Sequence, residues 1–441
     1  MGKTLAILTN GGDCPSLNAI IYYLREIAAE ENFDTVFGFQ GGYIGLITDD
    51  IIDLRKGRCH IDPHTGGSFL RALRGSPVPN PEERQKLNEE KRKEYDKKYR
   101  VWTQAALNTL KRRKIDVLIV IGGDGTAAAT RGFIPYIEAE EGCNTKIIFF
   151  PRTIDGDLWT DTDGYTGNGR IKVSADPGFF SALHKIKEAT ESLQSVAYST
   201  RRAFTIETMG RNAGWLACGT VLGGADAVII PEVDFLDDMI DGESIENRLY
   251  RKSAELYNVS NCLVVGVSEG TRFNGKQAMQ LRYGKRKLGG AGDLIARGGR
   301  VDESDPESPV IVGLEAALKE KGVVTKFYPK GFEGKNGYAI ELNPEVRCQH
   351  TDYEPRMGSP IPYDVELAKV LACRVRKMLR DGEFNRYPIL RELVPLEELS
   401  VELTESRPIE DALFFPLPEE LYDKRELTTT DAFNNIYRDI V

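Results

Sequence analysis

The feature that most constrains the fold is the alternation of short, almost wholly apolar runs with longer amphipathic stretches. The apolar runs lie at residues 5–8, 35–39, 117–121, 146–150, 203–207, 227–230 and 262–267. A helix is predicted from about Leu17 to Glu30, and an alanine-rich helix follows the run at 117–121. Strands covered by helices on both faces read as continuous apolar runs. The pattern therefore predicts an α/β protein with two Rossmann-like, doubly wound domains and mainly parallel sheets.

Length, charge and hydrophobicity indicate which classes of protein this chain does not belong to. A chain of 441 residues suggests two or three domains with a large core. The net charge of −9 argues against a nucleic-acid partner, and no apolar run approaches the ~20 residues of a membrane span. The N-terminal apolar run reads as a buried strand rather than a signal peptide, and the seven scattered cysteines include no CxxC pair. We therefore expect reduced thiols and a cytoplasmic protein.

The domain boundaries are weakly marked. We place the first α/β domain at 1–150, rejoined by part of the C-terminal region, the second at 151–380, and a wrapping extension at 381–441. Three segments read as additions to this core: a charged helix at 76–105, a loop or hairpin arm at 158–174 and a mobile glycine-rich loop at 271–305.

Glycine turns follow two of the predicted strands. Val117–Thr126 runs from a strand into Gly-Gly-Asp-Gly and a helix, where close backbone approach and free N–H groups suit a phosphate. Asp124 suits a Mg²⁺ ligand there, although an aspartate that caps a tight strand-to-helix turn fits equally. Gly11–Asp13 forms a second such turn, and Gly66–Gly67 leads toward Arg74. Together these turns favour a split phosphate site.

A third strand is followed by Pro151–Leu158, which contains two carboxylates. One of them, Asp155 or Asp157, could take a proton from a substrate hydroxyl while the other holds a metal, beside Arg152 and Thr153. An Asx turn that merely closes the loop is the alternative reading.

Several arginines and polar residues also lie next to strands. Arginine presents a planar fork that matches a phosphoryl group, so a set of arginines in an acidic protein indicates a local anion site. The set comprises Arg202, Arg211, Arg347 and Arg356. Surface salt bridges would explain any one of them, but explain the set poorly.

These motifs, in this order, resemble the phosphofructokinase family, whose enzymes transfer a phosphoryl group from ATP or pyrophosphate to the 1-hydroxyl of fructose 6-phosphate in glycolysis. The resemblance covers roughly residues 3–75, 106–270 and 345–380. The ordered set GGD, GGS-x-L-x-x-x-R, GGDGT, P-x-TID-x-D, MGR, EG and R-x-GSP-x-x-x-D is specific, whereas GGDGT alone also occurs in NAD and lipid kinases. It implies a donor-binding domain at 1–150 and a sugar-phosphate-binding domain at 151–380.

The resemblance also implies roles for single residues. Asp155 matches the catalytic base, with Asp124 at the Mg²⁺ position. The residues that match the rest of the catalytic group are Thr153, Asp157 and Arg211. Arg152 joins this group as a cation at a position where the family carries Gly or Lys, and so departs from its pattern. Those that match the donor site are Gly12, Tyr43, Arg74, Gly123, Asp124, Gly125 and Thr126. Those that match the sugar-phosphate site are Arg202, Met209, Gly210, Glu269, Arg347, Tyr353 and Arg356.

Two of these arginines imply an oligomer. Arg202 and Arg347 match arginines that reach across from a neighbouring subunit, so the resemblance implies a homodimer or homotetramer with shared sites.

The resemblance also implies Mg²⁺ as the cofactor, and it implies no nucleic-acid or membrane partner.

The phosphoryl donor is the open question. Gly125 leaves room for the α-phosphate of ATP, where pyrophosphate users of the family carry Asp. Arg152 would suit the end phosphate of pyrophosphate, and Gly156 gives a DGD loop like that of long pyrophosphate enzymes. We favour ATP, because a filled pocket excludes a nucleotide whereas a cation only favours one donor.

Other functions remain as alternatives. An NAD kinase would rest on GGDGT alone, and the MGR and Arg347–Arg356 segments argue against it. A non-catalytic sugar-phosphate sensor is disfavoured because Asp155, Asp124 and Arg211 are all in place. A different acceptor, such as sedoheptulose 7-phosphate, is a further alternative.

Overall fold

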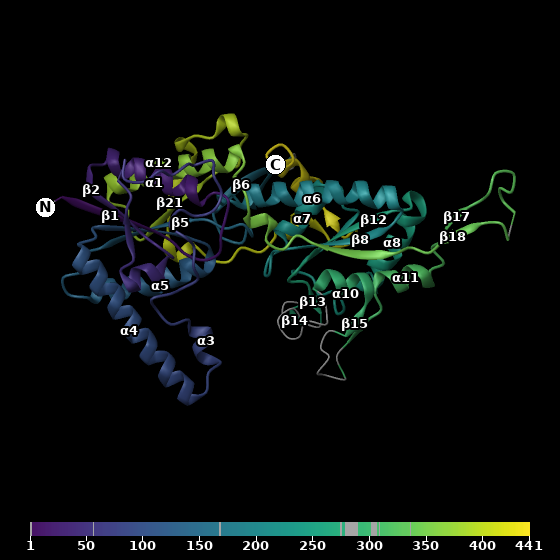
Figure 1. Cartoon of the computed structure of the whole chain (residues 1–441), viewed down its shortest axis with the longest axis horizontal. Coiled ribbons are helices and arrows are strands. Elements are labelled where there is room, and N and C mark those ends of the chain that lie inside the picture. The colour runs from purple at the N-terminus through teal and green to yellow at the C-terminus, as the bar shows by residue number, and fades with distance from the viewer. Residues whose placement is uncertain are drawn as a thin grey trace. The chain divides into compact units, whose positions relative to one another are not determined.

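The computed structural model describes residues 2–55, 57–166, 169–273, 276–277, 290–300, 307, 309–335 and 337–441. The chain forms two α/β units, each built on its own mainly parallel sheet (Figure 1). Unit 1 consists of Met1–Ala182, Arg356–Phe415 and Ile440; unit 2 consists of Leu183–Pro355, Pro416–Asp439 and Val441. The predicted fold class is confirmed. Among the described residues, no helix has the length and apolar character needed to cross a membrane.

Unit 1 contains a seven-stranded sheet in the order β21-β20-β5-β4-β1-β2-β3. Its strands are β1 (Lys3–Thr9), β2 (Phe33–Phe39), β3 (Ile51–Asp53), β4 (Val117–Gly122), β5 (Lys146–Pro151), β20 (Arg386–Leu390) and β21 (Thr404–Pro408). The inner strands run parallel, and only the edge strands β3 and β21 are antiparallel to their neighbours. Four of the predicted apolar runs therefore form β1, β2, β4 and β5.

Both faces of this sheet are covered, which explains the unbroken apolar strands. Ala6 and Leu8 of β1 pack in the core under α4 and α5, while Leu5 and Ile7 face the other way and are also fully buried. Figure 1 shows α1 and α12 on one face and α4 and α5 on the other. The helices of this unit are α1 (Leu17–Glu30), α2 (Tyr43–Thr48), α3 (Pro81–Gln85), α4 (Glu89–Arg113), α5 (Asp124–Ala139) and α12 (Pro362–Asp381).

The predicted additions take definite structure where they are described. The charged run at 76–105 forms α3 and the exposed first half of α4. The segment at 158–174 contains an antiparallel hairpin of β6 (Thr162–Thr166) and β7 (Gly169–Val173). The predicted loop at 271–305 lies partly outside the described residues, and the described part includes β13 (Arg272–Phe273), β14 (Lys276–Gln277), α10 (Ala291–Arg297) and β15 (Gly299–Arg300).

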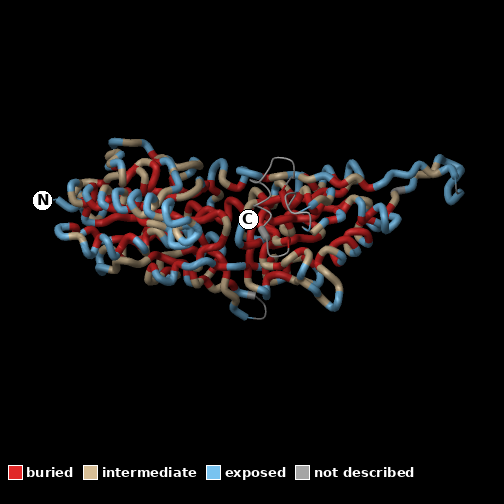
Figure 2. Tube along the Cα trace, turned by 90° about the horizontal axis from the view of Figure 1, so that it is seen from below, coloured by how far each residue is buried: buried red, intermediate tan, exposed pale blue. Residues whose placement is uncertain are grey.

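Unit 2 contains a four-stranded sheet, all parallel, in the order β19-β8-β12-β9. Its strands are β8 (Ala203–Thr208), β9 (Ala227–Ile229), β12 (Leu263–Ser268) and β19 (Val346–His350). Its described helices are most of α6 (Phe179–Thr200), together with α7 (Trp215–Leu222), α8 (Ile245–Ser260), α10 (Ala291–Arg297), α11 (Leu314–Glu320) and α13 (Asp431–Tyr437). Every residue of β8 and β12 is buried, and Figure 2 shows buried segments of the chain running through the interior of each unit.

Short pairs of strands extend unit 2. These are β10 (Met239–Ile240) with β11 (Glu243–Ser244), β13 (Arg272–Phe273) with β14 (Lys276–Gln277), β15 (Gly299–Arg300) with β16 (Val310–Ile311), β17 (Thr325–Phe327) with β18 (Ile340–Leu342), and β22 (Tyr422–Asp423) with β23 (Thr428–Thr429). The predicted C-terminal extension is thus divided. Its first part adds β20 and β21 to the sheet of unit 1, and its later part belongs to unit 2.

Unit 1 also runs beyond the boundary placed at residue 150, and the reason is a buried helix cap. Helix α6 (Phe179–Thr200) begins where Asp364 of α12 accepts hydrogen bonds from the backbone N–H groups of Gly178 (2.8 Å) and Ser181 (2.7 Å) and from the Ser181 hydroxyl (2.5 Å). Burial raises the pKa of Asp364 to about 6. These bonds attach the chain up to Ala182 to the C-terminal helix of unit 1.

We predict that Asp364→Ala lowers the free energy of unfolding by about 2–3 kcal/mol, because three buried donors lose their acceptor. Urea denaturation measures the loss. Asp381→Ala, at the exposed end of the same helix, is the matched control and should stay within about 0.5 kcal/mol of the wild type. Equal stability of the two variants would contradict the cap.

Candidate active site

In unit 1, the loops that follow β1, β4 and β5 meet at the carboxyl edge of the sheet. The N–H of Asn10 donates to the carbonyl of Ile121 at 2.9 Å, and the N–H of Arg152 donates to that of Gly122 at 2.9 Å. The N–H of Gly11 donates to the Leu73 carbonyl at 3.0 Å, which brings in the segment before Arg74. Ligands of doubly wound folds bind at this edge.

The Gly-Gly-Asp-Gly turn forms the start of α5. Gly123 is the N-cap residue and Asp124 is the first helical residue, so the first N–H groups of α5 lack partners within the helix. Gly125 is exposed, and a Cβ built there would have no heavy atom within 4 Å. Thr126 is buried and its hydroxyl accepts from the Asn10 side chain at 3.1 Å. The turn thus offers an open helix N-terminus of the kind that binds phosphate.

Tyr43 does not lie on this open surface. Its side chain is fully buried, its hydroxyl lies 2.7 Å from that of Thr130, and its ring packs edge-on against Phe133. Burial raises the pKa of Tyr43. Tyr43, which matches the donor site by resemblance, therefore packs in the core with its side chain, and its N–H donates to the Asn10 side chain at 3.4 Å.

The loop after β5 is organised by Thr153. Its hydroxyl donates to a carboxylate oxygen of Asp157 at 3.0 Å and accepts from the backbone N–H of Asp155 at 3.0 Å. Burial, followed by the negative charges of Asp155 and Asp124, raises the pKa of Asp157 well above its usual range. Three carboxyl groups therefore act on one another here. Oxygen ligands of this kind fit Mg²⁺, whose charge would compensate theirs.

Arg152 is a buried cation at the same edge. Only 3% of it is exposed, and its Nη2 donates to the Asn10 carbonyl at 3.0 Å. Its Nε has no hydrogen-bond partner among the described residues. Burial lowers the pKa of Arg152. A buried guanidinium with an unused donor is costly, and a bound phosphate would offset that cost.

Arg356 belongs to unit 1 and lies over the first glycine turn. Its Nη1 donates to the Asp13 carbonyl at 2.9 Å, and a Cβ on Gly12 would lie 2.6 Å from the same nitrogen. The glycine at position 12 therefore makes room for the guanidinium. The predicted sugar-phosphate arginine is thus placed beside a predicted donor loop.

In unit 2, two loops meet at the carboxyl edge of its sheet. The N–H of Glu269 donates to the Thr208 carbonyl at 2.9 Å, and the Ser268 hydroxyl donates to the Gly210 carbonyl at 2.5 Å. Gly210 has φ +114°, a conformation that favours glycine. These bonds hold the loop that carries Met209 and the exposed Arg211 next to Glu269.

Arg202 and Arg347 lie at the opposite, amino edge of this sheet. Arg202 precedes β8 and pairs with Glu345 at 2.7 Å, and Arg347 pairs with the same carboxylate at 2.5 Å. Strand β8 has six residues, so the two edges are separated by roughly 20 Å. Within unit 2, the structure therefore does not bring these two arginines to the Met209–Arg211 loop. Tyr353, which the resemblance assigns to the sugar-phosphate site, is 70% exposed.

A family model described as phosphofructokinase matches residues 4–379. The chain belongs to the phosphofructokinase family. The ATP-dependent 6-phosphofructokinase of Spirochaeta thermophila is 26% identical over 91% of this chain and 92% of that protein. The pyrophosphate–fructose 6-phosphate 1-phosphotransferase of Dictyoglomus thermophilum is 31% identical over 66% of this chain and 73% of its own length. Some other curated relatives align over less of their length, down to 57%.

Solved structures of the family share the fold. The crystal structure of the pyrophosphate-dependent phosphofructokinase from Nitrosospira multiformis matches with a TM-score of 0.68, at 17% identity, over 100% of this chain and 92% of that chain. The family resemblance stated from the motifs is confirmed.

Sequence reasoning missed one residue of this candidate site. Asn10 contacts all three loops: its carbonyl accepts from Arg152, its side chain donates to Thr126, and its own N–H bonds to β4. One signal in the sequence could have identified Asn10: it is a polar residue that directly follows a buried strand and precedes a pair of glycines.

We predict that Thr153→Val lowers the free energy of unfolding by about 1–3 kcal/mol, because the buried Asp157 loses a donor and the Asp155 N–H loses an acceptor. Thr153→Ser keeps the hydroxyl and should cost less than about 1 kcal/mol. Urea denaturation distinguishes them. If valine is tolerated as well as serine, the hydroxyl does not organise this loop.

Proposed function

We propose that this chain transfers a phosphoryl group to the 1-hydroxyl of fructose 6-phosphate, with ATP as the donor and Mg²⁺ as the cofactor. The observation that carries the proposal is the open position at Gly125, next to the interacting carboxyl groups of Asp124, Asp155 and Asp157. A phosphate at the N-terminus of α5 would lie beside a proton acceptor and oxygen ligands for a metal.

In this mechanism the residues of the chain position the two substrates, stabilise charge on the donor and accept the proton of the sugar hydroxyl. Asp155 accepts the proton of the sugar 1-hydroxyl while that oxygen attacks the donor phosphorus, and the Thr153 hydroxyl fixes the Asp155 backbone. The N–H groups of α5 and the Arg152 guanidinium stabilise charge on the donor phosphates. Asp124 would hold Mg²⁺, whose positive charge would compensate that of the donor phosphates. Arg211 and Glu269 hold the acceptor.

The open space at Gly125 is the argument for ATP. An aspartate there would project into that space and place a negative charge beside a donor phosphate. Because a glycine leaves the position empty, a nucleotide with an α-phosphate can be accommodated. The second candidate is a reversible pyrophosphate-dependent enzyme, and the buried Arg152 with its unused Nε favours it. Of the two relatives described above, one is named as an ATP-dependent enzyme and the other as a pyrophosphate-dependent enzyme.

We predict that the wild type forms fructose 1,6-bisphosphate with ATP and Mg²⁺ and not with pyrophosphate, when the two donors are assayed in parallel. Gly125→Asp should lower kcat/KM for ATP at least about 100-fold, since juxtaposed like charges cost several kcal/mol. Gly125→Ala adds a Cβ in open space without charge and is the matched control. Turnover with pyrophosphate only, or ATP use that survives in Gly125→Asp, would contradict the donor assignment.

Inactivity with both donors would have a different meaning. If the folded protein still binds fructose 6-phosphate, the sensor function takes the place of the enzyme. If it phosphorylates sedoheptulose 7-phosphate instead, the reaction class stands and the acceptor changes.

We further propose that the active form is at least a dimer in which Arg202 and Arg347 complete the site of a neighbouring subunit. The separation of these arginines from Arg211 across the sheet of unit 2 supports this. An arginine that cannot reach the loop of its own unit remains available to a second copy of the chain.

We predict that Asp155→Ala and Arg347→Ala are each nearly inactive alone, with Asp155→Ala losing at least about 10²–10⁴-fold in kcat. After subunit exchange, a mixture of the two should recover toward about a quarter of wild-type activity, because each hybrid dimer has one intact site. Arg251→Ala, at a similarly exposed arginine of unit 2, should keep full activity alone. No recovery, once tagged subunits prove exchange, would contradict the shared site.

A further inference from the structure

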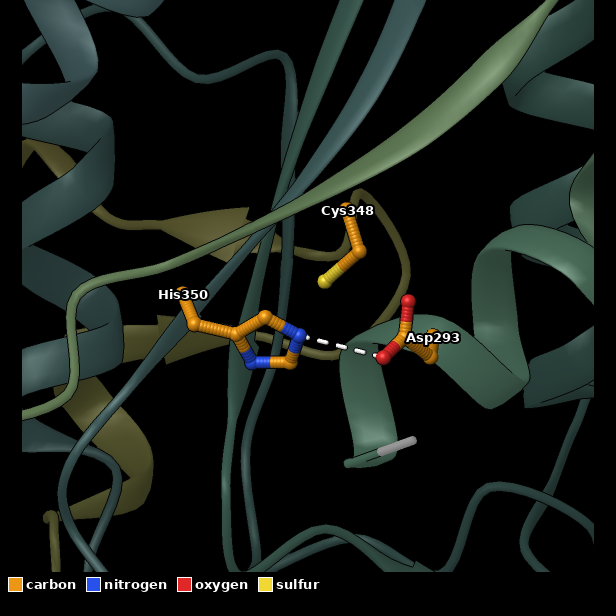
Figure 3. A group of neighbouring side chains, drawn as sticks. All are labelled: Asp293, Cys348 and His350. Carbon is orange, nitrogen blue, oxygen red and sulfur yellow. Dashed lines mark hydrogen bonds and ion pairs between the residues drawn. The ribbon is translucent and has the colours of Figure 1, made fainter. Parts of the chain in front are cut away.

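A cluster of metal-binding residue types lies in unit 2 and includes none of the residues assigned above, although Cys348 follows Arg347 in β19. Figure 3 shows Cys348, His350 and Asp293 pointing toward one another. One ligand atom from each (the thiol sulfur, a ring nitrogen and a carboxylate oxygen) lies within 4.8 Å of the other two. Cys348 and His350 are two residues apart on β19 and therefore share a face of the sheet, whereas Asp293 lies in the first turn of α10.

The fold holds α10 tightly against these strands. The N–H of Gly292 donates to a carboxylate oxygen of Glu207 on β8 at 2.9 Å, and the Thr205 hydroxyl donates to the Gly292 carbonyl at 2.9 Å. A Cβ on Gly292 would lie 2.7 Å from the sulfur of Cys348. A glycine at this position therefore allows the helix start to approach the thiol, which brings the neighbouring Asp293 into reach.

The imidazole of His350 is oriented by two carboxylates. Its Nε2 lies 3.1 Å from Asp293, and its Nδ1 lies 3.4 Å from Glu207, which is directly paired with it in the β8–β19 register and is 2% exposed. Histidines that bind a metal through one nitrogen characteristically donate the other N–H to a carboxylate. Glu207 occupies that second position.

We propose that Asp293, Cys348 and the Nε2 of His350 form a Zn²⁺ site, with Glu207 as a positioning residue. One sulfur, one nitrogen and one oxygen ligand suit a borderline-soft cation, whereas Mg²⁺ prefers oxygen ligands alone. A water completes a four-coordinate shell, because the His350 and Asp293 side chains are 29% and 31% exposed. On binding, Zn²⁺ displaces the thiol proton and the Nε2 proton to solvent.

The test uses the full-length chain, stripped with a chelator and then dialysed. Zn²⁺ titration by calorimetry should give about one high-affinity site per chain. Co²⁺ in place of Zn²⁺ should give a near-ultraviolet thiolate-to-metal absorption band. Cys348→Ser, His350→Gln and Asp293→Asn should each weaken Zn²⁺ binding at least about tenfold, and Cys348→Ser should abolish the Co²⁺ band. Glu207→Gln should weaken binding about 10–100-fold and leave the band in place.

Matched controls come from the same chain. Cys373→Ser, at a partly buried cysteine of α12, and His184→Gln, on α6, should bind Zn²⁺ as the wild type does. Circular dichroism of the metal-free variants verifies their fold. The proposal is overturned if the stripped chain shows no saturable Zn²⁺ binding, or if the three ligand variants bind it as tightly as the controls. In either case the cluster is an ion-pair network only. These readouts do not involve phosphoryl transfer, so the result is independent of the proposed function.

Discussion

The burial of both faces of the two parallel sheets is the constraint on which the rest of the molecule depends. With α1 and α12 on one side of unit 1 and α4 and α5 on the other, side chains along the strands have only apolar surroundings. In unit 1 the residues of the candidate active site therefore lie at the strand ends, where loops leave the sheet. In unit 1 that end carries the glycine turn of α5, the Asp155 loop and Arg152 within one hydrogen-bonded network.

As a result, buried carboxyl groups and a buried guanidinium lie together at one end of the sheet. An anionic ligand and a cation that bind there together would stabilise both kinds of group. Asp157 is driven toward its neutral form by burial and by two neighbouring carboxylates, while Arg152 is buried with a donor unused. Burial destabilises the charged form of each group unless a partner of opposite charge lies beside it. A phosphate with its divalent metal supplies both signs in one place, which is the electrostatic logic of phosphoryl transfer.

Unit 2 uses the two edges of one sheet for different purposes. Its carboxyl edge holds the Met209–Arg211 loop against Glu269, and its amino edge presents Arg202 and Arg347 around a single glutamate. On the face of the sheet, close to the carboxyl edge, Glu207 and His350 lie side by side under α10. The carbonyl of Glu207 also accepts from the N–H and hydroxyl of Thr351. The proposed Zn²⁺ cluster is therefore joined directly to the segment that leads to Tyr353.

The sequence by itself determined the fold class and seven of the eleven strands of the two sheets, because both-face burial leaves a local signature in residue type and order. Asp124, Gly125 and Asp155 needed no tertiary information to be proposed as site residues. Only the tertiary structure decided that Tyr43 is a core residue, that Asn10 joins the three loops, and that the C-terminal residues that rejoin unit 1 are 356–415. It also brought Asp293 to Cys348 and His350, which are more than fifty positions away in the sequence. Such contacts depend on strand order and helix packing between distant segments, which no local pattern encodes.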